Sequence, residues 1–180
     1  ATPLARRPLA RRCSPPCRLF STRSANGEDE RSSGARERRK RLWTGTRDGL
    51  CLYVPDRDAF IRTPIGLNHP SATNNRDIKA LFEDSRGEIW VATNGGLCRY
   101  VEGTDDFQVY RNDPKDPDSF SDLVAYSLAE APNGDLWVGT YTKGLDRYER
   151  ATGRFIHYPP DETDPSKPGA ALVYALEQGR

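Results

Sequence analysis

The chain has 180 residues, of which 29% are charged and 36% are apolar, a composition typical of a soluble protein. No stretch approaches the roughly 18 apolar residues that a membrane-spanning helix needs, and no apolar segment follows the basic N-terminus as in a secretory signal. Residues 1–41 hold eleven Arg and one Lys against four acidic residues, giving +8, so residues 42–180 must sum to −7 for the total of +1. This asymmetry indicates a tail joined to a domain.

Residues 1–41 are rich in Arg, Ser, Ala and Pro and have almost no apolar periodicity, so we expect a disordered basic tail. Three other interpretations stay open. The first 24 residues contain six Arg and no acid, as in an organelle transit peptide; the basic cluster at 36–41 could contact nucleic acid or anionic lipid; and the segment could be a translation artefact. Cys13 and Cys17 lack a nearby His or second Cys pair, so we expect no zinc site there.

From Leu42 onward the chain repeats with a period of about 47 residues, a signal that decides the architecture. The anchors are Trp43, Trp90 and Trp137, which are spaced by 47 and 47 residues. Each Trp is followed at matched offsets by Thr, Gly-Leu, Tyr and Phe. These positions are Thr46, Thr93 and Thr140; Gly49-Leu50, Gly96-Leu97 and Gly144-Leu145; Tyr53, Tyr100 and Tyr148; and Phe60, Phe107 and Phe155.

Each repeat has the pattern of four short strands separated by turns, most of which carry Gly. The predicted strands are Ile78–Phe82, Ile89–Thr93, Leu97–Tyr100 and Phe107–Tyr110 in one repeat, and Val124–Ala129, Leu136–Thr140, Leu145–Tyr148 and Phe155–Tyr158 in the next. Four antiparallel strands per repeat, arranged radially, describe a propeller blade. Both faces of a blade pack on neighbours, which explains apolar residues on both faces. A β-solenoid is the alternative, but its coils are usually shorter and do not need three hairpin turns.

We therefore predict an all-β fold, an incomplete β-propeller of four-stranded antiparallel blades that follows a disordered N-terminal tail. The predicted boundaries are a tail at 1–41 and a propeller fragment at 42–180, with a partial blade at 42–63, full blades at 78–110 and 124–158, and the start of the next blade at 172–180.

Few side chains are candidates for a disulfide or a catalytic site. Cys51 and Cys98 share a repeat position that Asp146 occupies in the third copy. Equivalent positions on adjacent blades lie farther apart than the roughly 7 Å between Cα atoms that a disulfide allows, so we expect two buried apolar residues without a bridge. His157 fills a strand position, which predicts a structural role, and His69 lies in a loop without a visible acidic partner. Two isolated His residues do not support a catalytic site.

The loops between blades are expected to form one rim of the propeller, where a ligand would sit. They span residues 64–77, 111–123 and 159–172. Asp113, Asp116 and Asp118 suggest calcium, but the loop lacks the Gly and the terminal Glu of an EF-hand, and its alternating Pro residues favour a rigid turn. We predict no catalytic residue, no metal site and no cofactor, and the sequence does not identify the ligand-binding residues.

The repeat resembles the two-component regulator propeller repeat. The matching segments are Ile78–Thr93, Leu136–Thr140, Gly144–Tyr148, Thr152–Phe155 and the loop Asn112–Ser121. The resemblance covers residues 42–180, and residues 1–41 have no counterpart in it.

This resemblance implies a signal-sensing segment of a sensor histidine kinase or hybrid, in a periplasmic or otherwise extracytoplasmic location. Such a segment would bind a small-molecule or carbohydrate-related signal without catalysis of its own. Its partners would be the rest of its propeller and a downstream signalling domain, such as a histidine kinase or diguanylate cyclase. Membrane contact would come only through regions outside this chain, and no nucleic acid is expected to bind the propeller. A propeller enzyme (lyase or hydrolase) and a protein-interaction scaffold remain the alternatives.

Overall fold

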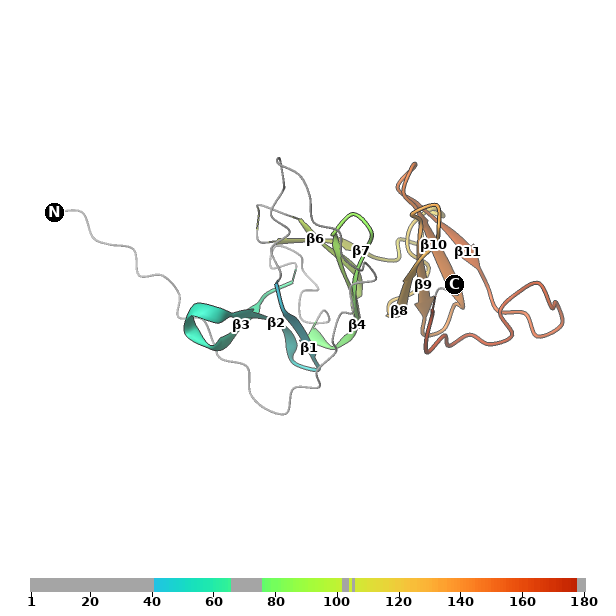
Figure 1. Cartoon of the computed structure of the whole chain (residues 1–180). Helices are drawn as coiled ribbons and strands as arrows, with labels where there is room; N and C mark the ends of the chain where they lie inside the picture. Colours follow the sequence, from blue (N-terminus) through green and yellow to red (C-terminus); the bar gives the residue numbers. More distant parts are fainter. Residues whose placement is uncertain (1–40, 66–75, 102–103, 105, 178–180) are drawn as a thin grey trace.

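The structure is a computed structural model that describes residues 41–65, 76–101, 104 and 106–177. Within these residues, strands form three antiparallel sheets (Figure 1). The first sheet holds β1 (Trp43–Thr46), β2 (Gly49–Val54) and β3 (Ala59–Thr63), with the 3-10 turn η1 (Pro55–Arg57) between the last two. The second holds β4 (Ile78–Glu83), β5 (Ile89–Thr93), β6 (Gly96–Val101) and β7 (Asp106–Tyr110). The third holds β8 (Ala125–Glu130), β9 (Leu136–Thr140), β10 (Leu145–Glu149) and β11 (Arg154–Tyr158).

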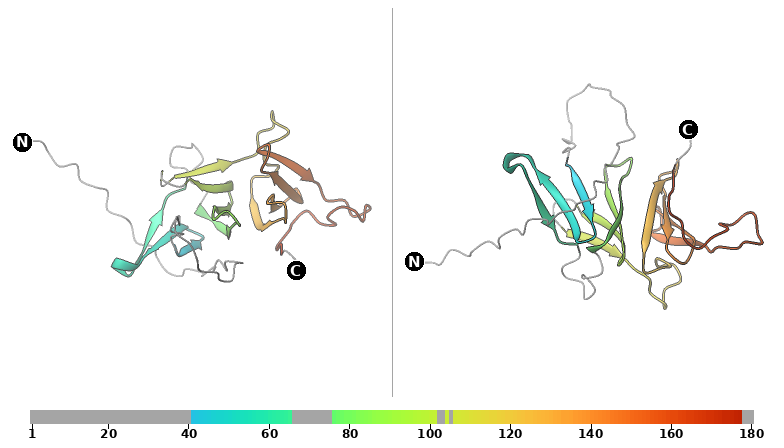
Figure 2. Two further views of the ribbon diagram at one scale, coloured as in Figure 1. Left: turned by 45° about the horizontal axis from the view of Figure 1, so that its top comes forward. Right: turned by 90° about the horizontal axis from the view of Figure 1, so that it is seen from below.

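Each sheet is a meander in which strands adjacent in sequence pair in the sheet. We call the sheets blades 1, 2 and 3 in chain order. The blades stand side by side (Figure 2), with β1 against β4 and β4 against β8. The predicted all-β, propeller-type fold is confirmed. In the described part of the chain, no helix is long and apolar enough to cross a membrane.

The predicted strands agree closely with the observed ones. β5 and β9 have the predicted bounds, and the other six strands of blades 2 and 3 differ by one residue at one or both ends. Residues 172–177, where the sequence predicts the start of another blade, adopt no regular strand. The predicted tail lies outside the described residues except for Arg41.

The apolar core lies between the blades. Trp90 and Ala92 of β5 belong to the cluster shared with blade 3, whereas Val91 between them belongs to the cluster shared with blade 1. All three side chains are fully buried. The strand is apolar throughout because successive side chains point to opposite faces and both faces are covered.

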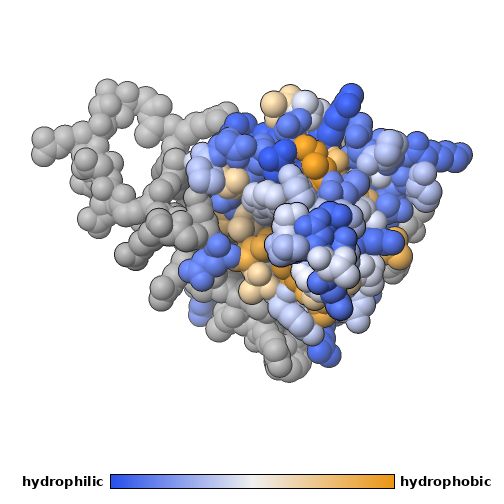
Figure 3. Space-filling view, turned by 90° about the vertical axis from the view of Figure 1, so that its right-hand side faces the viewer, coloured by the Kyte–Doolittle hydropathy of each residue, from blue (hydrophilic) through white to orange (hydrophobic). Residues whose placement is uncertain are grey.

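The outward face of blade 3 has fewer neighbours. Trp137 occupies the repeat position of Trp90 but is only partly buried, and Tyr141 and Tyr174 are 51% and 70% exposed. Figure 3, which views the molecule from this side, shows apolar patches between hydrophilic residues. This face therefore retains the apolar character that is buried between the other blades.

The Thr and Gly of the repeat shape the turn between the second and third strands. The Thr140 hydroxyl donates to the carbonyl of Gly144 (3.0 Å) and accepts from the amide of Lys143 (3.0 Å). Gly144 has a φ of +81°, and a Cβ there would lie 2.6 Å from the carbonyl oxygen of Tyr158. The position therefore requires glycine on both backbone and steric grounds.

We expect Gly144→Ala to destabilise the fold by roughly 1–3 kcal/mol, because Ala must adopt a positive φ and its Cβ meets backbone. Chemical denaturation of the full chain measures the change. Gly169→Ala is the matched control, since a Cβ at Gly169 would meet no atom within 4 Å. Equal losses in the two variants would contradict this account.

Candidate functional site

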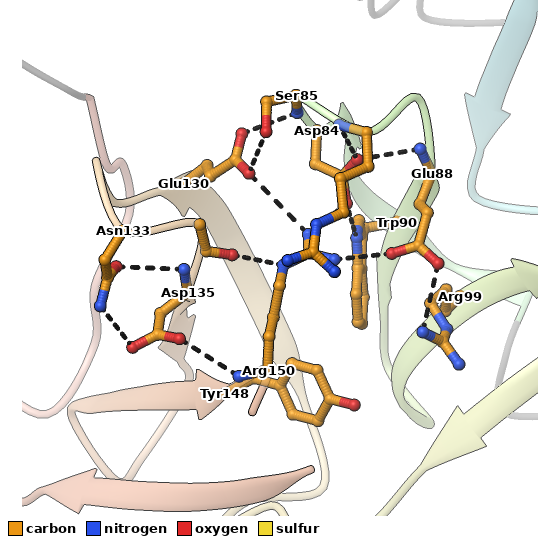
Figure 4. Close-up of polar contacts among 12 residues, drawn as sticks. Asp84, Ser85, Glu88, Trp90, Arg99, Glu130, Asn133, Asp135, Tyr148 and Arg150 are labelled. Atoms are coloured by element: carbon orange, nitrogen blue, oxygen red, sulfur yellow. Dashed lines mark hydrogen bonds and ion pairs between the residues drawn. The ribbon is translucent and has the colours of Figure 1, made fainter. Parts of the chain in front are cut away.

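A buried cation links the two complete blades. Arg150 follows β10 in blade 3, and its side chain, only 7% exposed, crosses to the β4–β5 turn of blade 2 (Figure 4). Its guanidinium donates to the carboxylate of Asp84 and to Oε2 of Glu88 at 2.6 Å. Oε1 of Glu130 lies 4.0 Å away, and the carbonyl of Gly134 accepts from Nε. We call Arg150, Asp84, Glu88 and Glu130 the Arg150 cluster.

Asp84 is the centre of this cluster on the blade 2 side. Its fully buried carboxylate accepts the amides of Arg86 and Glu88 (2.9 Å each) at Oδ1. At Oδ2 it accepts the indole N–H of Trp90 (2.8 Å) and the Arg150 guanidinium. One side chain thus closes the hairpin turn, orients the Trp of its own blade and pairs with the neighbouring blade.

The pair stays ionised. Burial alone would raise the pKa of Asp84, but the hydrogen bonds from Trp90 and Arg150 outweigh burial and lower the pKa below its ordinary value. Burial alone would lower the pKa of Arg150, but the hydrogen bonds to Asp84 and Glu88 raise it. A carboxylate and a guanidinium held in this way do not exchange protons near neutral pH, so they serve as a structural ion pair.

Three further contacts lie at this interface. The one between Arg99 and Trp90 is within blade 2, and the other two join blade 2 to blade 3. The guanidinium carbons of Arg99 and Arg150 lie 5.7 and 5.6 Å from the centroid of the Trp90 ring, within cation–π range. The carboxylate of Glu130 accepts both the amide (2.7 Å) and the hydroxyl (2.8 Å) of Ser85. Glu130 belongs to blade 3 and Ser85 to blade 2. Hydrogen bonds are therefore donated across the interface from each blade to the other.

A second buried charge, Asp146, holds the connection between blades. This residue of β10 is 0% exposed and accepts the amide and hydroxyl of Ser121 at 2.8 Å each. Its Oδ1 also lies 2.8 Å from Nδ1 of His157 on the paired strand β11. Ser121 belongs to the loop of residues 111–124 between β7 and β8, which we call the 111–124 loop. Asp146 therefore fastens this loop to blade 3.

The cysteines at the same repeat position behave differently. Cys98 is fully buried and free, and burial raises the pKa of its thiol to about 12, so it is not a nucleophile near neutral pH. Cys51 is 1% exposed and is disulfide-bonded. The prediction that the two do not bridge each other is correct, but the interpretation of Cys51 as a simple buried apolar residue was wrong.

The aspartates of the 111–124 loop are used in turns, in line with the rigid-turn interpretation. Asp113 accepts the amide of Lys115 and Asp116 accepts the amide of Asp118, both at 3.0 Å. Asp118 pairs with Arg154 of β11 at 3.2 Å. In the ranges that the structure describes, no group of three or more His, Cys, Asp or Glu side chains is arranged to hold a metal ion.

The remaining sequence candidates lie outside the described residues: His69, Cys13 and Cys17. His157 lies in β11 at the predicted strand position. From the sequence, Asp84 is expected in the hairpin turn, where it lies. Its pairing with Arg150 across the blades was missed, although the repeat offers a signal. At the repeat position of Arg150 the preceding copy has Glu102, and at the position of Asp84 the following copy has Ala131. A charge that changes between copies marks a contact specific to one interface.

A model of the two component regulator propeller family matches residues 72–95 and 119–142. Each match covers the first two strands of a complete blade and the turn that contains Asp84 or its counterpart. No protein of curated function matches the chain significantly.

Solved structures with the same fold include extracellular domains of two B. thetaiotaomicron proteins, each described as a putative hybrid two component system. BT3049 is 24% identical with a TM-score of 0.62, and the aligned region covers 74% of this chain and 18% of that chain. BT4673 is 27% identical with a TM-score of 0.61, with 75% and 17% covered. The chain thus spans less than a fifth of the length of each.

Removing the cation tests the role of the Arg150 cluster. We expect Arg150→Ala to lower the free energy of unfolding by roughly 3–5 kcal/mol, because the carboxylate of Asp84 is left buried without its partner. Chemical denaturation measures the loss. The matched control is Arg86→Ala, an exposed side chain on the same turn, which should change stability by less than about 0.5 kcal/mol. Losses of similar size in both variants would argue against a stabilising role of the Arg150 cluster.

The lowered pKa of Asp84 predicts an acid-sensitive interface. Its contribution is complete above the unfolded pKa of about 3.9 and is lost as the pH falls toward the lower folded pKa. The stability difference between the unaltered chain and Asp84→Asn should therefore be constant from about pH 5 to 8 and shrink between about pH 4 and 2. Urea denaturation at a series of pH values measures it, and a difference that does not vary down to pH 2 would refute the assignment.

Proposed function

Because the chain carries repeats of the two component regulator propeller family, we propose that it is a segment of the signal-sensing propeller of a two-component regulatory protein, a sensor histidine kinase or a hybrid. The observation that carries the proposal is the 47-residue repeat, matched by the family model in both complete blades. The solved structures with the same fold add support, since they are extracellular domains of proteins described as hybrid two component systems. An extracytoplasmic location for this chain is part of the proposal.

The segment would bind a signal without transforming it. The buried charges of blades 2 and 3 support this part of the proposal, because their polar atoms are engaged in holding the fold. Asp84 and Arg150 pair between blades, and Asp146 fastens a loop. The free thiol of Cys98, with a pKa of about 12, is unsuited to nucleophilic catalysis. A propeller enzyme would instead need titratable groups left available to a substrate.

The expected ligand is a small molecule or a carbohydrate-related signal, and the expected partners are the rest of the propeller and a downstream signalling domain. In such an arrangement the blades described here supply a rigid scaffold, and ligand binding at the rim would alter how the propeller contacts its neighbours. The output reaction would belong to the downstream domain.

A thermal-shift screen of the full chain against a panel of mono- and oligosaccharides and small metabolites tests the proposal. We expect at least one compound to raise the melting temperature saturably. A free ligand concentration of 100 times the Kd stabilises the folded state by about 2.7 kcal/mol.

Sucrose serves as the control, because an excluded osmolyte stabilises without saturation. Shifts that never saturate for any compound would contradict ligand binding. Release of cleavage products, followed by chromatography, would instead identify an enzyme.

A further inference from the structure

The 111–124 loop is held against the outer strands of blade 3 along most of its length. Phe120 is fully buried against Phe155, with ring centroids 5.5 Å apart. The amide of Phe155 donates to the carbonyl of Asp118 at 2.8 Å, and Ser121 donates twice to Asp146. The part from Phe120 onward is therefore anchored by apolar burial and by a buried carboxylate. The part before it is joined to blade 3 by the backbone hydrogen bond of Asp118 and by two side chains of β11, Arg154 and His157.

His157 makes one of those outer contacts, and both of its ring nitrogens face acceptors. Nδ1 lies 2.8 Å from Oδ1 of Asp146, and Nε2 lies 2.9 Å from the carbonyl oxygen of Pro117. A carbonyl only accepts, and an ionised carboxylate only accepts. A neutral imidazole has a single N–H, so it can satisfy one of the two contacts but not both. The geometry thus calls for the doubly protonated imidazolium.

The charges around His157 favour that form. Asp146 approaches from β10 and Asp118 from the loop, where Asp118 also pairs with Arg154 of β11. Burial alone would lower the pKa of His157, but the hydrogen bonds to Asp146 and Pro117 and the two carboxylate charges raise it above the ordinary value. The side chain is 32% exposed, so it can exchange its proton with solvent.

We propose that His157 is a proton-dependent latch, which fastens the Asp113–Ser119 part of the 111–124 loop to blade 3 while the imidazole is charged and releases the Pro117 contact when the imidazole is neutral. This proposal stands on the geometry of the loop and does not depend on the proposed function.

The two acceptors determine which contact is lost when the imidazole loses its proton. On deprotonation the remaining N–H stays with Asp146, because a charged acceptor forms the stronger hydrogen bond. The lone pair on Nε2 then faces the carbonyl of Pro117, and the contact becomes repulsive. Since the folded pKa lies above the ordinary value of about 6.5, the latch is complete below about pH 6.5 and opens as the pH rises through the raised value. Phe120 and Ser121 keep the C-terminal half of the loop in place.

Amide hydrogen exchange of the full chain between pH 6 and 9, corrected for the intrinsic pH dependence of exchange, tests the latch. We expect the amides of Asp113, Lys115, Asp116, Asp118 and Ser119 to lose protection by about ten-fold in a single step with a midpoint above 6.5, because one charge-assisted hydrogen bond is lost. The loop of residues 159–171, at the same place after the next blade, contains no His and should show no step.

Two variants complete the experiment. His157→Gln should abolish the step, whereas His69→Gln, at the only other histidine, should leave it unchanged. A step that persists in His157→Gln would overturn the proposal. If that variant does not fold, NMR titration of the His157 imidazole in the unaltered chain decides: a midpoint above 6.5 that coincides with the exchange step supports the latch, and a midpoint at or below 6.5 refutes it.

Discussion

Blade 2 is apolar on both faces and is covered on both by its neighbours, and the rest of the structure depends on that constraint. Successive side chains of β5 enter opposite clusters, with Trp90 facing blade 3 and Val91 facing blade 1, and both are fully buried. A single sheet with two apolar faces is not stable alone, because neither face can be left to water. Stability is therefore a property of the contacts between neighbouring blades.

The buried, apolar interface in turn determines how the polar groups behave. A charge brought between two sheets must be paired, because an isolated buried charge is far too costly. Arg150 meets Asp84, and Asp146 meets Ser121 and His157. These charged residues vary from copy to copy, whereas the Trp, Thr and Gly-Leu positions recur. The apolar positions build the scaffold, and the variable polar positions distinguish one interface from the next.

Much of the fold could be predicted from the sequence, because its signals are local. The turn glycines and the spaced Trp residues place strands such as β5 and β9 at their observed bounds. The Arg150 cluster could not be predicted in this way, because Arg150 and Asp84 lie 66 residues apart and meet only when two blades pack. The contacts of His157 could not be predicted from the sequence either. Its partner Asp146 lies opposite it in the strand pairing, but the carbonyl of Pro117 comes from a loop with no periodicity.

The Arg150 cluster also makes the blades unequal. Blade 2 offers Asp84 to the blade that follows it, whereas blade 3 has Ala131 at that position and offers no such carboxylate. A duplicated copy of blade 3 placed after blade 3 would bring its arginine to an alanine and leave a buried guanidinium without its carboxylate. The two sides of this interface come from the same repeat, but they are not interchangeable. Copying one blade therefore copies the apolar contacts and loses the buried ion pair.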